Sequence, residues 1–404
     1  MFCDVRERGF GDRASMDEVL AWIDRYSRIS ETECIAVEQA TGRFLAESFI
    51  APSDVPRVDT AARDGYAVRS CETVGAGSYN PLPFSLQNPR NALRPFSAAL
   101  VAAGMPLPLG ADTVVPFDSA NAEEKFINVI LPVAQGEGVN RTGQNVQQED
   151  VLISTSRPLR ASDVGLISSF GVTEVWVVRR PRVRIIVAGS KCSVERKAID
   201  ANGPMLVPKI LRDGGMIEAF TYGMDGVAEL AGRISRPGAD VVIVCGRTGT
   251  GPDDDAPVAL ATAGNVSIHG IAVHPGGSTG VGFVGQVPVL LLPGDPLECF
   301  CAYDLFAGRL IRNLSGRNPA LPYKILQAKA GRKFVSSVGT TELCPVRLAG
   351  EEAFPLGAAG SADFVSIARA DGFILVPETM EGYAPGTPVT VHKYDGFDEA
   401  ESVL

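Results

Sequence analysis

DVVIVCGRTGTGPDDD, residues 240–255, is the stretch that decides the fold. The apolar residues 241–244 predict a strand that is buried on both faces. Gly246, Gly249 and Gly251 permit backbone conformations that other residues avoid, and the acids at 253–255 stand where a helix is expected to begin. Such a turn can hold an anion on its amides and a cation on its carboxylates.

Outward from this stretch, apolar strand patterns alternate with helical patterns. We expect strands at 183–187, 217–222, 240–244 and 287–292, and helices at 204–211, 226–234, 256–263 and 297–314. Regular alternation of this kind predicts a parallel, doubly wound α/β domain. Three of the strands end in turns that contain glycine, at 188–192, 245–251 and 293–296. Because ligands bind at the carboxyl ends of such strands, these turns form the predicted site.

The flanking regions have different patterns. Ser15 and Glu18 have the capping-box spacing and predict a helix that runs to about Arg28. Residues 29–179 are rich in Pro and Gly, so we expect irregular, mainly β structure, with short β segments at 33–37, 113–117, 126–130 and 174–178 and one helix at 161–169. After Asn318, β-type segments at 329–348, 363–367, 373–376 and 388–392 predict a small all-β domain.

Composition narrows the class of protein. A length of 404 residues predicts several domains, and a net charge of -10 argues against a general nucleic-acid surface. Neither a long apolar run nor a secretion signal is visible, so we expect a cytoplasmic protein. The eight cysteines are scattered. Only Cys299 and Cys301 are close, and on a helix they would point about 200° apart, so we expect reduced, structural thiols.

Common catalytic motifs do not fit. Pro252 follows Gly251 where a Walker A loop has Lys, and the third glycine of a Rossmann fingerprint is missing. The chain has three histidines and no Gly-x-Ser-x-Gly elbow. Carboxylates are better candidates because divalent cations prefer oxygen ligands. Asp64, Asp225 and Asp254 follow or flank turns, although spacing alone does not gather them and each could be a helix cap.

Several motifs resemble the molybdopterin molybdenumtransferase family, the bacterial MoeA and gephyrin E-domain proteins. PRVDTAARDGYA at 56–67 resembles that family's P-x-x-D-x-S-A-M-D-G-Y-A, and GMPLPLGADTVV at 104–115 resembles its G-x-P-x-P-x-G-A-D-x-V-V. DAN at 200–202, LPGDP at 292–296, Gly360-Ser361 and ADG at 370–372 are similar to further family motifs in the same order.

The resemblance implies an elongated homodimer of four-domain chains. Domain I would comprise 1–52 and 147–181, the mainly β domain II 53–146, the molybdopterin-binding α/β domain III 182–320, and the β domain IV 321–404. It also implies insertion of molybdate into adenylylated molybdopterin with release of AMP, assisted by a divalent cation such as magnesium.

Site residues are carried over by position. The family's acids match Asp64, Asp225 and Asp254 as catalytic residues, with Asp225 and Asp254 as ligands if a metal binds. The residues expected to bind the pterin ligand are Gly246, Arg247, Thr248, Gly249, Thr250, Gly251, Pro293, Gly294, Pro296, Lys191 and Ser361.

Departures from the family concern charge. Gln144 and Asn145 replace an acidic pair and Lys191 replaces an acid, while Gly249 stands where the family has serine. Two lysines become His274 and Gly277, and an arginine becomes Pro345. These changes are expected to weaken metal and molybdate binding, because both depend on local charge.

Three functions therefore remain open. The first is an active transferase in which Arg247 and His274 replace the missing cations. The second is a degenerate paralogue that only binds a pterin or nucleotide-like anion, with the Lys191 ammonium neutralising Asp225 and Asp254. The third is an unrelated sugar-phosphate or nucleotide enzyme on the same fold.

Overall fold

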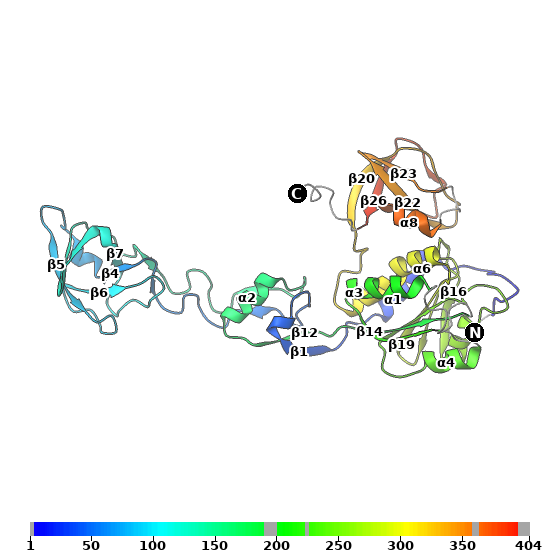
Figure 1. Cartoon of the computed structure of the whole chain (residues 1–404), viewed down its shortest axis with the longest axis horizontal. Coiled ribbons are helices and arrows are strands. Elements are labelled where there is room, and N and C mark those ends of the chain that lie inside the picture. Colours follow the sequence, from blue (N-terminus) through cyan, green and yellow to red (C-terminus); the bar gives the residue numbers. More distant parts are fainter. Residues whose placement is uncertain (1–3, 190–199, 223–225, 358–362, 395–404) are drawn as a thin grey trace. The chain divides into compact units, whose positions relative to one another are not determined.

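The chain divides into two compact units. The computed structural model describes residues 4–189, 200–222, 226–357 and 363–394. Unit 1 comprises Met1–Glu33 and Val178–Leu404, and unit 2 comprises Cys34–Val177 (Figure 1). The finer division into four domains stays a prediction.

Unit 1 is built on a six-stranded sheet. Its strand order is β14 (Met216–Tyr222), β13 (Arg182–Val187), β15 (Val241–Cys245), β19 (Val287–Leu292), β18 (Gly280–Val284), β16 (Asn265–His269). The first four strands are parallel, as predicted, and β18 and β16 add an antiparallel hairpin that the sequence patterns did not predict. Glycines at 280 and 282 weaken the apolar pattern of β18, which explains the omission.

Helices cover both faces of this sheet, so the doubly wound prediction is confirmed. They are α3 (Asn202–Arg212), α4 (Val227–Ile234), α5 (Ala256–Ala263), α6 (Pro296–Ala302) and α7 (Gly308–Leu314), with a π-helical segment, η6 (Tyr303–Ala307), joining the last two. Alternate residues of β15 enter the two cores: Ile243 packs with α3 and α7, whereas Val244 packs with α4 and α5. Burial on both faces accounts for the unbroken apolar run.

The N-terminal helix α1 (Met16–Tyr26) also belongs to unit 1. Ser15 Oγ accepts from the Glu18 amide at 3.2 Å, and Glu18 Oε2 accepts from the Ser15 amide at 2.7 Å, which confirms the capping box. Val19 and Ile23 are buried in the core formed by β13, β15 and α7. The chain therefore begins against the α/β domain before it enters unit 2.

A β-barrel with one helix ends the described chain. The sheet order is β17 (Val273–His274), β22 (Thr341–Ala349), β23 (Glu352–Pro355), β20 (Lys324–Ala330), β26 (Pro388–Lys393), β24 (Gly372–Val376), and pairing of β22 with β24 closes the barrel. A short pair, β21 (Phe334–Val335) and β25 (Gly382–Tyr383), lies beside it.

One β prediction in this region is wrong. Residues 363–367 were expected as a β segment but belong to helix α8 (Phe364–Arg369). Asp363 caps this helix, because its carboxylate accepts from the Ser366 amide at 2.9 Å. The cap overrides the β propensity of Phe364 and Val365.

Unit 2 is irregular and mainly β, as predicted. Its six-stranded sheet has the order β7 (Thr113–Val115), β4 (Gly65–Val68), β6 (Ser97–Val101), β5 (Leu82–Gln87), β9 (Phe126–Val129), β8 (Ala120–Ala122). Two-stranded pairs join β1 (Thr32–Ala36) with β12 (Glu174–Val178), β2 (Phe49–Ile50) with β11 (Val151–Ile153), and β3 (Thr60–Ala61) with β10 (Val139–Asn140). The predicted helix is α2 (Ala161–Ser169), and short 3₁₀ turns are η1 (Val37–Gln39), η2 (Ser70–Thr73) and η3 (Phe117–Ser119).

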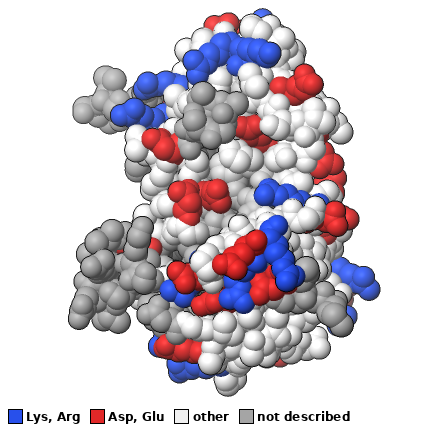
Figure 2. Space-filling view, turned by 90° about the vertical axis from the view of Figure 1, so that its right-hand side faces the viewer, with Lys and Arg blue, Asp and Glu red and all other residues white. Residues whose placement is uncertain are grey.

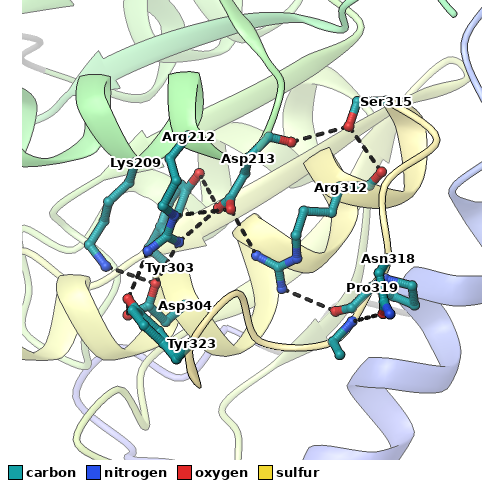
Figure 3. Close-up of polar contacts among 11 residues, drawn as sticks. Lys209, Arg212, Asp213, Tyr303, Asp304, Arg312, Ser315, Asn318, Pro319 and Tyr323 are labelled. Carbon is teal, nitrogen blue, oxygen red and sulfur yellow. Dashed lines mark hydrogen bonds and ion pairs between the residues drawn. The ribbon is translucent and has the colours of Figure 1, made fainter. Parts of the chain in front are cut away.

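A buried polar network fixes the helices of unit 1 to the segment that leads into the barrel (Figure 3). Asp304, on η6, is fully buried and accepts from Lys209 Nζ at 2.7 Å and from Tyr323 Oη at 2.8 Å. Asp213 is also fully buried and pairs with Arg212 and Arg312. Because each carboxylate has cationic and hydrogen-bonding partners, the burial of charge is compensated.

Candidate functional site

The glycine turn lies where the ends of three parallel strands meet. Gly246 has φ +95°, and a Cβ there would lie 2.5 Å from the Ala188 carbonyl oxygen at the end of β13. A Cβ on Gly294, after β19, would lie 3.2 Å from the Gly246 Cα. The predicted convergence of these turns is therefore confirmed for the described residues, and glycine at 246 is required both by its conformation and by the close approach.

The acids after the turn hold the turn itself. Asp254 Oδ2 accepts from the Gly251 amide at 2.7 Å. Asp255 precedes α5 and pairs with Arg6 at 2.9 Å and with Arg247 at 3.2 Å. Arg247 itself has φ +56°, a conformation uncommon for residues other than glycine. Its guanidinium therefore links the turn to the start of α5 through the ion pair with Asp255.

An N-terminal segment, residues 4–13, lies along the same turn. The Glu7 amide donates to the Thr250 carbonyl at 2.8 Å, in addition to the Arg6 ion pair. The Phe10 ring packs edge-on against His269 with centroids 5.0 Å apart. No local sequence pattern connects residues so far apart in the chain, so this contact was not predicted from the sequence.

The opening of the site lies between the α/β sheet and the barrel. Strand β17 pairs in parallel with β22, which places His274 opposite Glu342. On the other side, Ala14 forms a parallel bridge with Ile271. These pairings bring Arg13, His274 and Glu342 to one place from three distant parts of the chain.

A cavity of about 520 Å³ opens there, and we call it the crevice. It is lined on the α/β side by residues that include Gly249, Thr250 and Ser278, and on the barrel side by Ser337 and Thr340. A second cavity of about 510 Å³ shares His274 and Glu342 with the crevice and continues along the barrel past Arg332, Lys333 and Pro345. Each volume is within the usual range for small-molecule sites.

Charged groups of both signs face the crevice. His274 Nδ1 lies 3.8 Å from Glu342 Oε1, and hydrogen bonding to this carboxylate raises the His274 pKa although partial burial opposes the rise. Burial, reinforced by the charge of Asp295, raises the pKa of Glu298. Arg13 also lines the crevice. Protonated His274 and Arg13 can bind an oxyanion, and the carboxyl groups can exchange protons.

The wider surface is mixed in charge. Figure 2 shows the side of the molecule at the right of Figure 1, where Lys and Arg side chains lie interspersed with Asp and Glu. This face therefore shows no large patch of one sign of charge.

Only some of the residues expected to bind the pterin ligand line the crevice. Gly249 and Thr250 line the crevice; Thr248 is buried, and its hydroxyl lies 3.1 Å from Ser278 Oγ. Gly246 and Gly294 pack against each other, the Pro293 carbonyl accepts from Cys245 Sγ, and Pro296 begins α6. Lys191, Asp225 and Ser361 lie outside the described residues.

Asp64 belongs to unit 2. Its Oδ1 accepts from the Ala103 amide at 2.7 Å, so it holds the turn after β6. Within the described residues no group of three or more His, Cys, Asp or Glu is arranged to hold a metal ion. Asp225 is not among them, so the predicted grouping of acids stays a prediction.

The paired cysteines of α6 point apart, as expected. Cys299 Sγ lies 3.5 Å from Cys245 Sγ in the core of the sheet, whereas Cys301 packs with Leu343 and Phe373 of the barrel. Both are free thiols, and burial raises the pKa of Cys301 well above its usual value.

Comparison with known proteins covers nearly the whole chain. Residues 14–171 match the family model "MoeA N-terminal region (domain I and II)", residues 184–313 match "Probable molybdopterin binding domain", and residues 327–394 match "MoeA C-terminal region (domain IV)". The fold and the crevice thus define a multidomain protein with an α/β domain of the molybdopterin-binding type. The chain belongs to the MoeA family of molybdopterin biosynthesis proteins.

Individual relatives agree with this assignment. The chain is 25% identical over 378 residues to the molybdopterin molybdenumtransferase of Staphylococcus aureus strain COL, covering 88% of this chain and 90% of that one. It is 27% identical over 407 residues to the Bacillus subtilis strain 168 protein of the same name, covering 93% of each. The crystal structure of the molybdopterin biosynthesis MoeA protein from Pyrococcus horikosii is similar with a TM-score of 0.82 and 29% identity, covering 96% of this chain and 100% of that one.

In the described part of the chain, every helix is too short or too polar to cross a membrane.

Proposed function

We propose that the protein is a molybdopterin molybdenumtransferase that inserts molybdate into adenylylated molybdopterin and releases AMP. The observation that carries the proposal is the crevice, because one cavity brings together the glycine turn, His274 and the rim of the barrel. The names of the Staphylococcus and Bacillus relatives support the same reaction. We further propose that the chain acts as a cytoplasmic homodimer, as the family resemblance implies.

Each side of the crevice has a role in this reaction. The glycine turn and the Ser278 hydroxyl would hold the phosphate groups of the adenylylated pterin, since Gly249 leaves the backbone accessible. Protonated His274 would balance the negative charge of molybdate or of the departing AMP. Arg247 is tied to Asp255, so of the two cations proposed as replacements His274 is the one that faces the crevice.

The acids Asp64, Asp225 and Asp254 remain the proposed catalytic residues, with Asp225 and Asp254 as the ligands if magnesium binds. One oxygen of Asp254 accepts from the Gly251 amide, and the described residues contain no group of three or more His, Cys, Asp or Glu that could hold a metal ion. Asp225 lies outside the described residues, and we assign no step to that ion.

Release of AMP from adenylylated molybdopterin tests the proposal. Purified protein is incubated with the substrate and magnesium, with and without molybdate, and AMP is separated by chromatography. The transferase predicts release that depends on molybdate and saturates with substrate. Absence of release at an enzyme concentration equal to the substrate concentration contradicts it.

A second function rests on the same residues. The engagement of Asp254 and Asp255 within the turn favours a protein that binds the pterin ligand without transforming it. Such a protein would bind adenylylated molybdopterin in a titration and yet release no AMP. The two functions thus differ in turnover and agree in binding.

A further inference from the structure

We propose that Arg13 is an oxyanion-binding residue of the crevice, which acts with His274 to hold a tetrahedral oxyanion such as molybdate or a phosphate group. The inference deepens the proposed function and rests on it for the identity of the substrate. Arg13 was not among the residues predicted from the sequence, since it lies outside every motif that resembles the family.

Backbone pairing places Arg13 at the crevice. The Ala14 amide donates to the Gly270 carbonyl at 3.1 Å, and the Ala272 amide donates to the Ala14 carbonyl at 2.8 Å. This bridge fixes the residue before Ala14 beside the loop that leads from β17. The guanidinium of Arg13 lies over the Phe10 ring, 5.1 Å from its centroid, and this cation–π contact orients it.

The loop after β17 leaves room for this guanidinium. A Cβ on Gly277 would lie 2.6 Å from Arg13 Nη1, the far end of a flexible side chain, so a side chain at 277 would require the guanidinium to move. Gly277 is not among the glycines with positive φ, so its backbone would permit a side chain. We infer that glycine at 277 makes space for the Arg13 guanidinium, which lies beside the residue where the family resemblance places a lysine.

Arg13 and His274 are the basic residues in the lining of the crevice. Arg13 has no ion-pair partner within 4.0 Å among the described residues, while the carboxylates of Glu298 and Glu342 line the same crevice. In the described part of the chain the backbone amides of Gly277 and Ser278 donate to no other group. A guanidinium, a protonated imidazole and backbone amides are donors that can bind a tetrahedral oxyanion, and the residues that carry them all line the crevice.

Moving the cationic side chain from residue 13 to residue 277 tests the inference. Binding of molybdate to the full-length protein is measured by isothermal titration calorimetry for the wild type, Arg13→Ala, Gly277→Lys and the double variant Arg13→Ala with Gly277→Lys. Arg8→Ala removes the same charge from the exposed part of the segment and is the matched control. Circular dichroism confirms that each variant is folded, and Arg13→Gln replaces Arg13→Ala if that variant is not.

We expect Arg13→Ala to weaken molybdate binding at least tenfold and Gly277→Lys to weaken it too, because the new side chain collides with Arg13. The double variant should recover to within about threefold of wild type, since one cation again fills the position. Unchanged binding in Arg13→Ala, a double variant no better than Arg13→Ala, or a wild type that binds no oxyanion overturns the inference.

Parallel titrations with phosphate and sulfate identify the oxyanion. Preference for molybdate assigns the subsite to the metal oxyanion, and preference for phosphate assigns it to the phosphate of the pterin ligand. AMP release is measured separately. If the wild type binds oxyanion through Arg13 but releases no AMP, the transferase is contradicted and the subsite is retained. If AMP release is the same in Arg13→Ala as in the wild type, the subsite alone is contradicted.

Discussion

Asp254 Oδ2 accepts a hydrogen bond from the backbone amide of Gly251, 2.7 Å away, so the acid that the family resemblance marks as catalytic also closes the glycine turn. The structural role of this carboxylate is shown by the hydrogen bond, and the proposed function adds a chemical role to it. Substitutions that keep the hydrogen bond and remove the charge can separate them.

Asp254→Asn should leave stability within about 0.5 kcal/mol, because the amide oxygen can still accept from Gly251. Asp254→Ala should lose about 1 kcal/mol with the hydrogen bond. If the carboxylate takes part in the reaction, both variants lose AMP release at least tenfold. The measurements are the free energy of unfolding in urea and the rate of AMP release. Full activity in Asp254→Asn would show that Asp254 has only a structural role in the turn.

Glycine at 249, where the family has serine, follows from the same contact. A Cβ at this position would lie 2.8 Å from Asp254 Oδ2, so Gly249→Ser should displace Asp254 and cost about 1–3 kcal/mol. Gly232→Ser is the control, because a Cβ there meets nothing within 4 Å and the helix α4 should gain about 0.5 kcal/mol. Equal unfolding midpoints for the two variants would show that the turn tolerates serine.

How far the sequence predicts this structure depends on the range of the interactions involved. Helix α5 and strand β19 have the predicted bounds, because apolar periodicity and end signals are local. The meeting of the turns at Gly246 and Gly294 followed from the geometry of parallel sheets. Arg13 and Glu342 could not be placed in the site, because the bridges from Ala14 to Ile271 and from β17 to β22 join segments that no local pattern connects.

The buried pair of Lys209 and Asp304 should contribute strongly to the stability of unit 1. Lys209→Met leaves Asp304 with one cation fewer in a fully buried position and should cost about 3–5 kcal/mol. The partly exposed pair of Arg309 and Asp24 is the control, and Arg309→Gln should cost less than about 1 kcal/mol. Comparable losses in urea unfolding would mean that the network in Figure 3 does not fix the helices.

His274 should make oxyanion binding dependent on pH. Its pKa is raised, chiefly by Glu342, so the imidazolium persists above the ordinary value of about 6.5. Molybdate affinity is then highest below that range and falls as pH rises through the His274 pKa; any stability from the pair is lost in the same direction. Arg13 and Glu298 also face the imidazole and act on its pKa in opposite directions.

Glu342→Gln removes the main cause of the rise, so the midpoint should move to lower pH. The chain has three histidines, which allows His274 to be followed by NMR with His274→Ala as the assignment control. An unchanged midpoint in Glu342→Gln would contradict the assigned cause.

Obstruction of the crevice tests most directly that this cavity is the substrate site. Thr340 lines the crevice, whereas Val338 is exposed nearby on the same segment and does not line it, so Thr340→Trp and Val338→Trp form a matched pair. Binding of adenylylated molybdopterin is measured by calorimetry for both variants and the wild type. We predict that Thr340→Trp weakens this binding at least tenfold and that Val338→Trp leaves it unchanged. Wild-type affinity in a folded Thr340→Trp variant would contradict the account.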